Sequence, residues 1–288
     1  MVQDTILSVG AAAEKKNGLL GASLPRYLVL SALAGAYVGL GIALIFAIGA
    51  PLWAAQSPFL KVVMGASFGV ALTLVIFAGS ELFTGNNLFL TIGVLTGRTH
   101  LRDLSVLWAL CFAGNLAGSL LLAWLVAQSG VLSADPQQAF ILKTAGAKMT
   151  LSFWPLFARG VLCNWLVCLA VWCAARTQSE SARLVMIFWC LFAFIGAGFE
   201  HSVANMTLLG IGLFLPHAAP VSWAGFAANL LPVTLGNVVG GAGFVAGIYW
   251  LASPVRRFAL PAPAETVAAP ASTPERASRV AVPAASAA

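Results

Sequence analysis

The stretch GFEHSVANM, Gly198–Met206, interrupts the apolar run of residues 184–215 with polar side chains. Glu200, His201 and Asn205 place ionisable or amide groups where a membrane span normally has none. At bilayer depth such groups each cost several kcal/mol unless they are paired or hydrated. An intramembrane ionisable residue predicts a functional site, so we interpret this stretch as the centre of a substrate pathway.

The composition is that of a membrane protein. Of the 288 residues, 60% are hydrophobic and only 8% are charged, whereas a soluble domain carries about 25% charged residues. The net charge is +6, but no basic run is interleaved with aromatic residues, so we expect no nucleic-acid partner. The five cysteines fall in apolar runs without metal-ligand spacing. We therefore expect a lipid bilayer as solvent, and neither a metal nor another cofactor.

Six segments are apolar enough to cross a membrane, for which about 20 residues are needed. They are approximately residues 27–48, 62–78 with a continuation at 88–95, 104–126, 153–174, 184–215 and 233–251. The second segment is broken by GSELFTGNN and the fifth by the stretch quoted above. We predict an N-terminal helix or tether (1–25), a six-span channel domain (26–252) and a disordered Ala/Pro/Ser-rich tail (253–288).

The distribution of basic residues predicts the orientation. An even number of spans places both termini on one side of the membrane. The other side holds only Lys61, Lys143 and Lys148, whereas the terminal side holds Lys15, Lys16, Arg26, Arg98, Arg102, Arg176, Arg183, Arg256 and Arg257. Because cytoplasmic loops carry an excess of Lys and Arg, we expect both termini in the cytoplasm.

The two breaks are copies of one another. GSELFTGNNLFL (79–90) aligns without a gap with GFEHSVANMTLL (198–209), and in the following spans GNLAG (114–118) aligns with GNVVG (236–240). Three spans separate equivalent elements, so the second copy is inverted relative to the first. Inverted repeats with one broken helix in each half place a binding site near the membrane midplane.

The equivalent residues Glu81 and Glu200 have two possible roles. Broken spans must satisfy the backbone groups that the break frees. We therefore expect the two glutamates to bond those groups, with contact to substrate as the alternative.

Three segments resemble signature sequences of the formate/nitrite transporter family, namely ELFTGNNLF (81–89), LCNWLVCLAVW (162–172) and GFEHSVANM (198–206). The last two are most similar to its nitrite branch, and the resemblance covers about residues 20–251. It implies an all-α, aquaporin-like protomer of six transmembrane helices, with an inverted 3+3 repeat and broken second and fifth helices. It also implies a homopentamer in the bacterial cytoplasmic membrane that conducts small monovalent anions or their acids and is not an enzyme.

The resemblance also assigns residues. It implies pore residues at His201, Asn205, Thr84 and Lys148. It implies apolar constrictions at Phe68 and Phe194 on one side of the centre, and at Leu72, Leu82 and Phe83 on the other. It implies that Asn86 and Asn164, like the two glutamates, are structural residues at the helix breaks.

The chemistry of the proposed substrate explains the residue types. A bare anion crossing an apolar constriction would cost tens of kcal/mol on an idealised estimate. Lys148 and helix N-termini attract the anion, and a proton delivered at His201, or by a water beside it, would neutralise it. Nitrite is the leading substrate, and formate and hydrosulfide stay open.

Other classes of protein compete with this interpretation. A water or glycerol pore shares the architecture, but neither break carries an Asn-Pro-Ala sequence. An intramembrane hydrolase built on Ser67 and His201 is suggested only by the GASFG pattern at 65–69, which small-residue helix packing also explains. A structural or sensor protein would tolerate the loss of His201 without a change in solute flux.

Overall fold

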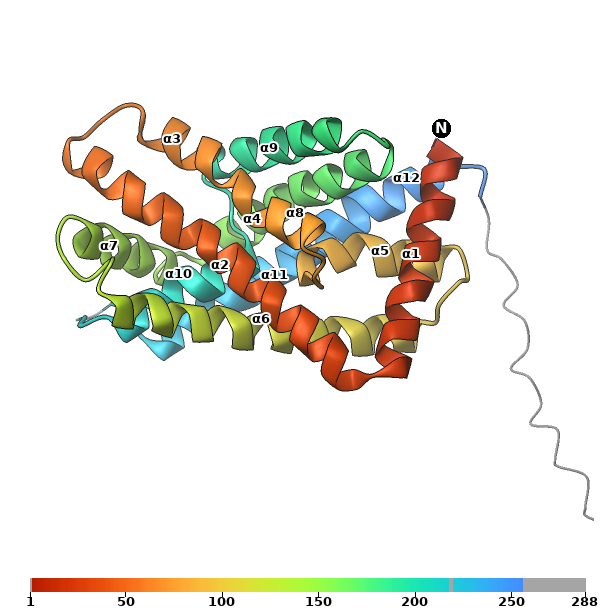
Figure 1. The fold of residues 1–288 in the computed structure, drawn as a ribbon, viewed down its shortest axis with the longest axis horizontal. Helices are drawn as coiled ribbons and strands as arrows, with labels where there is room; N and C mark the ends of the chain where they lie inside the picture. Colours follow the sequence, from red (N-terminus) through yellow and green to blue (C-terminus); the bar gives the residue numbers. More distant parts are fainter. Residues whose placement is uncertain (1, 218–219, 256–288) are drawn as a thin grey trace, which may run out of the picture. The chain divides into compact units, whose positions relative to one another are not determined.

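The computed structural model describes residues 2–217 and 220–255, and this part of the chain is built from helices without strands (Figure 1). The predicted tail, apart from residues 253–255, lies outside the described residues. The elements are α1 (Val2–Ala22), α2 (Leu24–Ala54), α3 (Leu60–Ser67), α4 (Gly69–Phe77), α5 (Phe83–Leu95), α6 (Leu101–Ser129), α7 (Gln137–Met149), α8 (Phe153–Ala175), α9 (Glu180–Ala197), α10 (Ser202–Phe214), α11 (Trp223–Val238), the π-helix η1 (Val239–Gly247) and α12 (Ile248–Leu251).

Six helical segments are long and apolar enough to span a membrane, as the sequence predicts. Helices α3 and α4 form one of them, bent at Phe68, and α11, η1 and α12 form another. This last span begins at Trp223, well before the predicted start near residue 233. It continues through Pro232 because membrane helices tolerate proline where neighbouring groups satisfy the freed backbone.

Two spans are broken at equivalent positions. The second span ends at Phe77 and resumes as α5, and the fifth ends at Ala197 and resumes as α10. Helices α5 and α10 have 13 residues each, too short to cross the bilayer alone. The chain leaves each preceding helix through a glycine with positive φ, 77° at Gly79 and 79° at Gly198. Glycine adopts this left-handed conformation without strain, which explains why both copies of the repeat carry it.

The spans that flank the breaks pack as two equivalent pairs, α2 with α6 and α8 with α11. A Cβ on Gly118 would overlap the carbonyl of Ala32, and a Cβ on the equivalent Gly240, in the π-helix η1 that continues α11, would overlap the carbonyl of Val161 of α8. Small residues allow membrane helices to approach at backbone distance. The two pairs therefore hold the breaks at fixed positions in both halves.

The N-terminal segment is a packed helix. Helix α1 lies against α5 (Figure 1) and buries Ile6, Val9 and Ala13. The sequence left open whether residues 1–25 form a peripheral helix or a tether. The packing of α1 brings its residue Lys16 beside the first helix break.

Candidate functional site

Three cavities follow one another between the two breaks. A cavity of about 500 Å³ is lined by Lys16 and is called the Lys16 vestibule. A cavity of about 140 Å³ is lined by Lys148 and is called the Lys148 vestibule. Between them lies the waist, a space of about 10 Å³ lined by Val38, Phe68, Ala71, Leu72, Leu82, Val167, Leu191, Phe194 and His201.

Shared lining residues connect the three cavities into one route. Leu72 and Leu82 line both the waist and the Lys16 vestibule. Phe194 and His201 line both the waist and the Lys148 vestibule. A water molecule needs at least about 10–15 Å³ of such space, so the waist has barely the room for one water and cannot hold a hydrated ion.

The two vestibules are built from equivalent positions of the repeat. In the repeat alignment, all residues of the first break that line the Lys16 vestibule, except Glu81, have counterparts that line the Lys148 vestibule. The pairs around the breaks are Gly79 with Gly198, Ser80 with Phe199, Leu82 with His201, Gly85 with Ala204, Asn86 with Asn205 and Phe89 with Leu208. The cavity system thus carries the pseudo-twofold symmetry that the sequence repeat predicts.

An asparagine fastens the first break to its neighbours. The Oδ1 atom of Asn115 accepts a hydrogen bond from the Phe83 N–H at 2.9 Å. Its Nδ2 donates to the carbonyl of Ser31 at 2.7 Å and to that of Glu81 at 2.9 Å. One buried side chain therefore satisfies both a donor and an acceptor that the break leaves without a helical partner.

Asn237 does the same at the second break. Its Oδ1 accepts from the Ser202 N–H at 2.8 Å, and its Nδ2 donates to the carbonyls of Gly160 at 2.8 Å and Glu200 at 3.0 Å. The sequence predicts that the carboxylates of Glu81 and Glu200 bond the freed backbone groups. These asparagines bond them instead, and the GN dipeptides shared by the two copies are the signal in the sequence that marks them.

The carboxylate of Glu200 holds a lysine and an asparagine. Its Oε2 accepts from Lys148 Nζ at 2.6 Å and from Asn205 Nδ2 at 2.6 Å. Asn205 Nδ2 also donates to Asn229 Oδ1 at 2.8 Å, so its amide group faces the glutamate and not His201. The Glu200 side chain is only 2% exposed, and a charge buried so deeply persists only with such partners.

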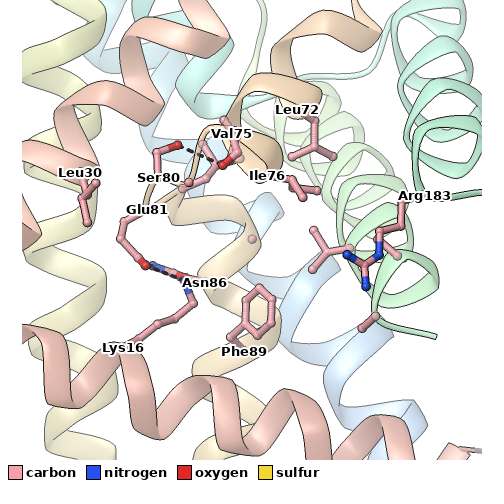
Figure 2. Close-up of a pocket in the computed structure, with 16 residues that line it drawn as sticks. Lys16, Leu30, Leu72, Val75, Ile76, Ser80, Glu81, Asn86, Phe89 and Arg183 are labelled. Carbon is pink, nitrogen blue, oxygen red and sulfur yellow. Dashed lines mark hydrogen bonds and ion pairs between the residues drawn. The ribbon is translucent and has the colours of Figure 1, made fainter. Parts of the chain in front are cut away.

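Glu81 makes the equivalent cluster at the first break (Figure 2). Lys16 Nζ lies 2.7 Å from Glu81 Oε2, and Asn86 Nδ2 donates to the same oxygen at 3.0 Å. Lys16 Nζ also lies 4.9 Å from the centroid of the Phe89 ring. Each vestibule therefore holds a Lys–Glu–Asn cluster. Sequence reasoning missed Lys16, although α1 precedes the first span as α7 precedes the fourth.

Thr84 and His201 join the two breaks. Thr84 Oγ1 lies 2.9 Å from His201 Nε2, and both residues are buried. His201 Nδ1 accepts the Ala204 N–H at 3.1 Å and caps the N-terminus of α10. Because Nδ1 is an acceptor, the single proton of the neutral imidazole lies on Nε2 and is donated to Thr84.

Aromatic contacts close the waist. The rings of Phe68 and Phe194 meet edge to face with centroids 5.6 Å apart, and Phe194 stacks on His201 at 6.0 Å. Of the five residues expected at constrictions, Phe68, Leu72, Leu82 and Phe194 line the waist. Leu191, the repeat partner of Leu72, lines it too and was missed.

Phe83 lies elsewhere. Its ring packs edge to face against Phe112 and Trp108, with centroids 5.2 and 6.3 Å away, and it lines none of the three cavities. It belongs to the packing between α5 and α6.

Asn164 links the two halves of the protein. Its Nδ2 donates to the carbonyl of Thr84 at 3.1 Å, to Asn87 Oδ1 at 3.0 Å and to the carbonyl of Asn237 at 2.7 Å. A side chain of α8 therefore supports the break that positions Thr84.

The geometry does not assemble a hydrolase. Ser67 Oγ donates to the carbonyl of Val63 at 2.9 Å, one turn earlier in its own helix. His201 Nε2 bonds Thr84, and Ser67 is not among the residues that line the waist. The nucleophile–base contact that such chemistry requires is thus replaced by two separate hydrogen bonds.

Comparison with known proteins agrees with this arrangement. The family model described as "Formate/nitrite transporter" matches residues 3–251. "Nitrite transporter NirC" of Escherichia coli (strain K12) is 45% identical over 254 residues, which cover 88% of this chain and 93% of that protein. "Probable formate transporter" of Methanothermobacter thermautotrophicus is 41% identical over 265 residues, covering 86% and 94%.

Solved structures of similar proteins have the same fold. The chain matches an "FNT family ion channel" with a TM-score of 0.83 and 46% identity, covering 87% of this chain and 99% of that one. It matches a "Pentameric formate channel with formate bound" with a TM-score of 0.69 and 29% identity, covering 79% and 96%. This multi-pass membrane protein belongs to the formate/nitrite transporter family.

Proposed function

We propose that the protein conducts nitrite across the bacterial cytoplasmic membrane, and that the anion is neutralised beside His201 before it passes the waist. The observation that carries this proposal is the shape and polarity of the route. Two vestibules, each with a Lys–Glu–Asn cluster, meet at an apolar space of about 10 Å³ whose single polar side chain is His201. The 45% identity to proteins called nitrite transporters supports nitrite as the substrate.

The apolar lining of the waist excludes charged substrates. An anion that enters it exchanges its hydration shell for Phe68, Leu72, Leu82 and Phe194, at a cost of tens of kcal/mol on the idealised Born estimate. The neutral acid avoids most of that cost. Because a low dielectric disfavours the charged form, an anion at the edge of the waist gains basicity and takes up a proton there.

The hydrogen bonds of His201 indicate where this proton comes from. An imidazolium would have two N–H donors and would lose the bond from the Ala204 N–H to Nδ1. The positive N-terminal end of α10 disfavours a second positive charge as well. We therefore assign the proton to the bulk solution, from which vestibule water relays it to the anion, and give His201 Nε2–H the role of a hydrogen-bond donor that turns from Thr84 to the entering substrate.

The vestibules collect the anion. Lys16 and Lys148 each donate to a glutamate and retain N–H groups for a further acceptor, since an ammonium group has three. In this proposal Asn86 and Asn205 orient the glutamates, and Thr84 orients His201 when no substrate is bound.

We further propose a homopentamer whose protomers each contain a pore, with both termini in the cytoplasm. The pentameric state of the formate channel that this chain resembles supports the assembly. The excess of Lys and Arg in the loops on the terminal side supports the orientation. The Lys16 vestibule then opens to the cytoplasm.

Flux into proteoliposomes tests the proposal, with nitrite, formate, hydrosulfide and nitrate compared at two external pH values. The protonated fraction of a weak acid rises about tenfold for each unit by which pH falls below neutrality, as long as the anion predominates. Nitrite flux should rise in that direction. Nitrate, the anion of a strong acid, should pass poorly at both values, and nitrate flux equal to nitrite flux would contradict neutralisation.

Formate is the second candidate substrate. The chain is 41% identical to a protein called a probable formate transporter, and formate is a weak acid that the same waist would pass. If the ratio of maximal flux to half-saturating concentration were higher for formate than for nitrite in the same vesicles, formate would become the leading substrate and nitrite the second candidate.

A further inference from the structure

At one pair of equivalent positions, the two vestibules differ in formal charge. In the repeat alignment, Arg183 of α9 corresponds to Met64 of α3. Arg183 lines the Lys16 vestibule and Met64 lines the Lys148 vestibule. A cation therefore stands on one side of the waist where the pseudo-symmetric site on the other side has an apolar side chain.

The Arg183 guanidinium is held in place by the loop that precedes α9. Its Nε and Nη2 donate to the carbonyl of Thr177 at 3.1 and 3.0 Å. Figure 2 shows the side chain extending from α9 toward the cavity. A guanidinium has five N–H donors in a fixed fork, so a bond to one carbonyl leaves others for a ligand in the vestibule.

The charges of the two vestibules are consequently unequal. Lys16 pairs with Glu81, and Lys148 pairs with Glu200, so each of these pairs is close to neutral. Within the described part of the chain, no carboxylate forms an ion pair with Arg183. The Lys16 vestibule therefore has one positive charge more than the Lys148 vestibule.

We propose that Arg183 is an anion-binding residue of the Lys16 vestibule alone, and that it makes the pore functionally asymmetric. A cleft lined by one sign of charge raises the local concentration of the opposite ion. An anion entering from this side then saturates the pore at a lower concentration than one entering from the other side. This inference rests on the proposed function, because it needs an anion that uses the route.

The experiment measures nitrite uptake against concentration in right-side-out and inverted membrane vesicles that contain the full-length protein. Arg183→Met copies the residue of the opposite vestibule, and Arg183→Lys keeps the charge. We expect Arg183→Met to raise the half-saturating concentration roughly threefold to tenfold in one vesicle orientation only, with maximal flux unchanged. Arg183→Lys should stay within about twofold of the parent protein, because the lysine charge still attracts the anion.

Two further measurements separate charge from structure. The effect of Arg183→Met should vanish near 1 M inert salt, where the Debye length is about 3 Å. The reciprocal Met64→Arg should lower the half-saturating concentration in the opposite vesicle orientation.

Results that contradict the role of Arg183 differ from results that contradict nitrite conduction itself. Equal effects in both orientations, no effect, or a loss with Arg183→Lys as large as with Arg183→Met would overturn the role of Arg183 and indicate an anchor for the loop at Thr177. If the parent protein itself gave no saturable uptake, the proposed function would fail first.

Discussion

Thr84 and His201 are 117 positions apart in the sequence, and 2.9 Å separates Thr84 Oγ1 from His201 Nε2. Each residue lies next to one of the two helix breaks, Thr84 in the first turn of α5 and His201 at the N-cap of α10. Their hydrogen bond is thus the point at which the two inverted halves meet at the waist.

Thr84→Val tests this contact with little change of shape. Valine removes the acceptor for His201 Nε2–H, so the imidazole loses its orientation. A hydrogen bond of this kind contributes about 1 kcal/mol, and we expect nitrite flux in proteoliposomes to fall about fivefold to tenfold. Thr84→Ser restores the hydroxyl group and should restore flux. Equal flux in the valine and serine variants would show that the Thr84 hydroxyl group has no role in conduction.

Glu200→Gln should destabilise the protein strongly. The substitution leaves Lys148 without its carboxylate in a site where the glutamate side chain is 2% exposed. Breaking a buried ion pair costs about 3–5 kcal/mol, which thermal unfolding of the detergent-solubilised protein would measure. Glu14→Gln is the matched control. Its pair with Arg98 is exposed, with the Glu14 side chain 46% exposed, and should cost less than about 1 kcal/mol.

Asn237→Ala should loosen the second break. The Ser202 N–H and the carbonyls of Gly160 and Glu200 lose their partner, and a buried unsatisfied group costs about 1–3 kcal/mol. We expect lower thermal stability together with reduced flux, since the break also positions His201. Asn115→Ala should have the same effect at the first break. Asn17→Ala, for which the structure records no side-chain hydrogen bond, should change neither quantity, and similar losses in all three variants would contradict the assignment.

Gly118→Ala should disturb the packing of α2 on α6. The added methyl group would overlap the carbonyl of Ala32, which is backbone and cannot rotate away. Overpacking of this kind costs about 1–3 kcal/mol, seen as a lower unfolding temperature. Gly196→Ala adds the same methyl group at a helical position with no neighbouring atom within 4 Å. It should therefore be tolerated, and a larger effect there than at residue 118 would refute the packing argument.

The repeat made the central arrangement predictable. Because GSELFTGNNLFL and GFEHSVANMTLL align without a gap, the meeting of two breaks near the midplane follows from the sequence, and so do six spans. Phe68, Leu72, Leu82 and Phe194, which the family resemblance implies at constrictions, line the waist. Local polarity thus indicates which helices break and where their ends converge.

Side-chain direction could not be predicted in the same way. Phe83 and Thr84 are adjacent in the first turn of α5, yet the Phe83 ring packs on α6 and the Thr84 side chain faces His201. The face of a short helix depends on tertiary packing, which the alignment does not contain. The side-chain partners of Glu81 and Glu200 could not be predicted for a related reason, because Lys16 and Lys148 come from helices outside the aligned segments.

The volume of the waist has a consequence for the energy supply of the cell. A file of hydrogen-bonded waters is the usual conductor of protons through a membrane protein, and a space of about 10 Å³ between Phe68 and Leu82 interrupts any such file. Hydronium therefore has no continuous chain of waters from one side of the membrane to the other. A weak acid that crosses as a neutral molecule carries one proton and no net charge, so protons pass this pore only together with the substrate.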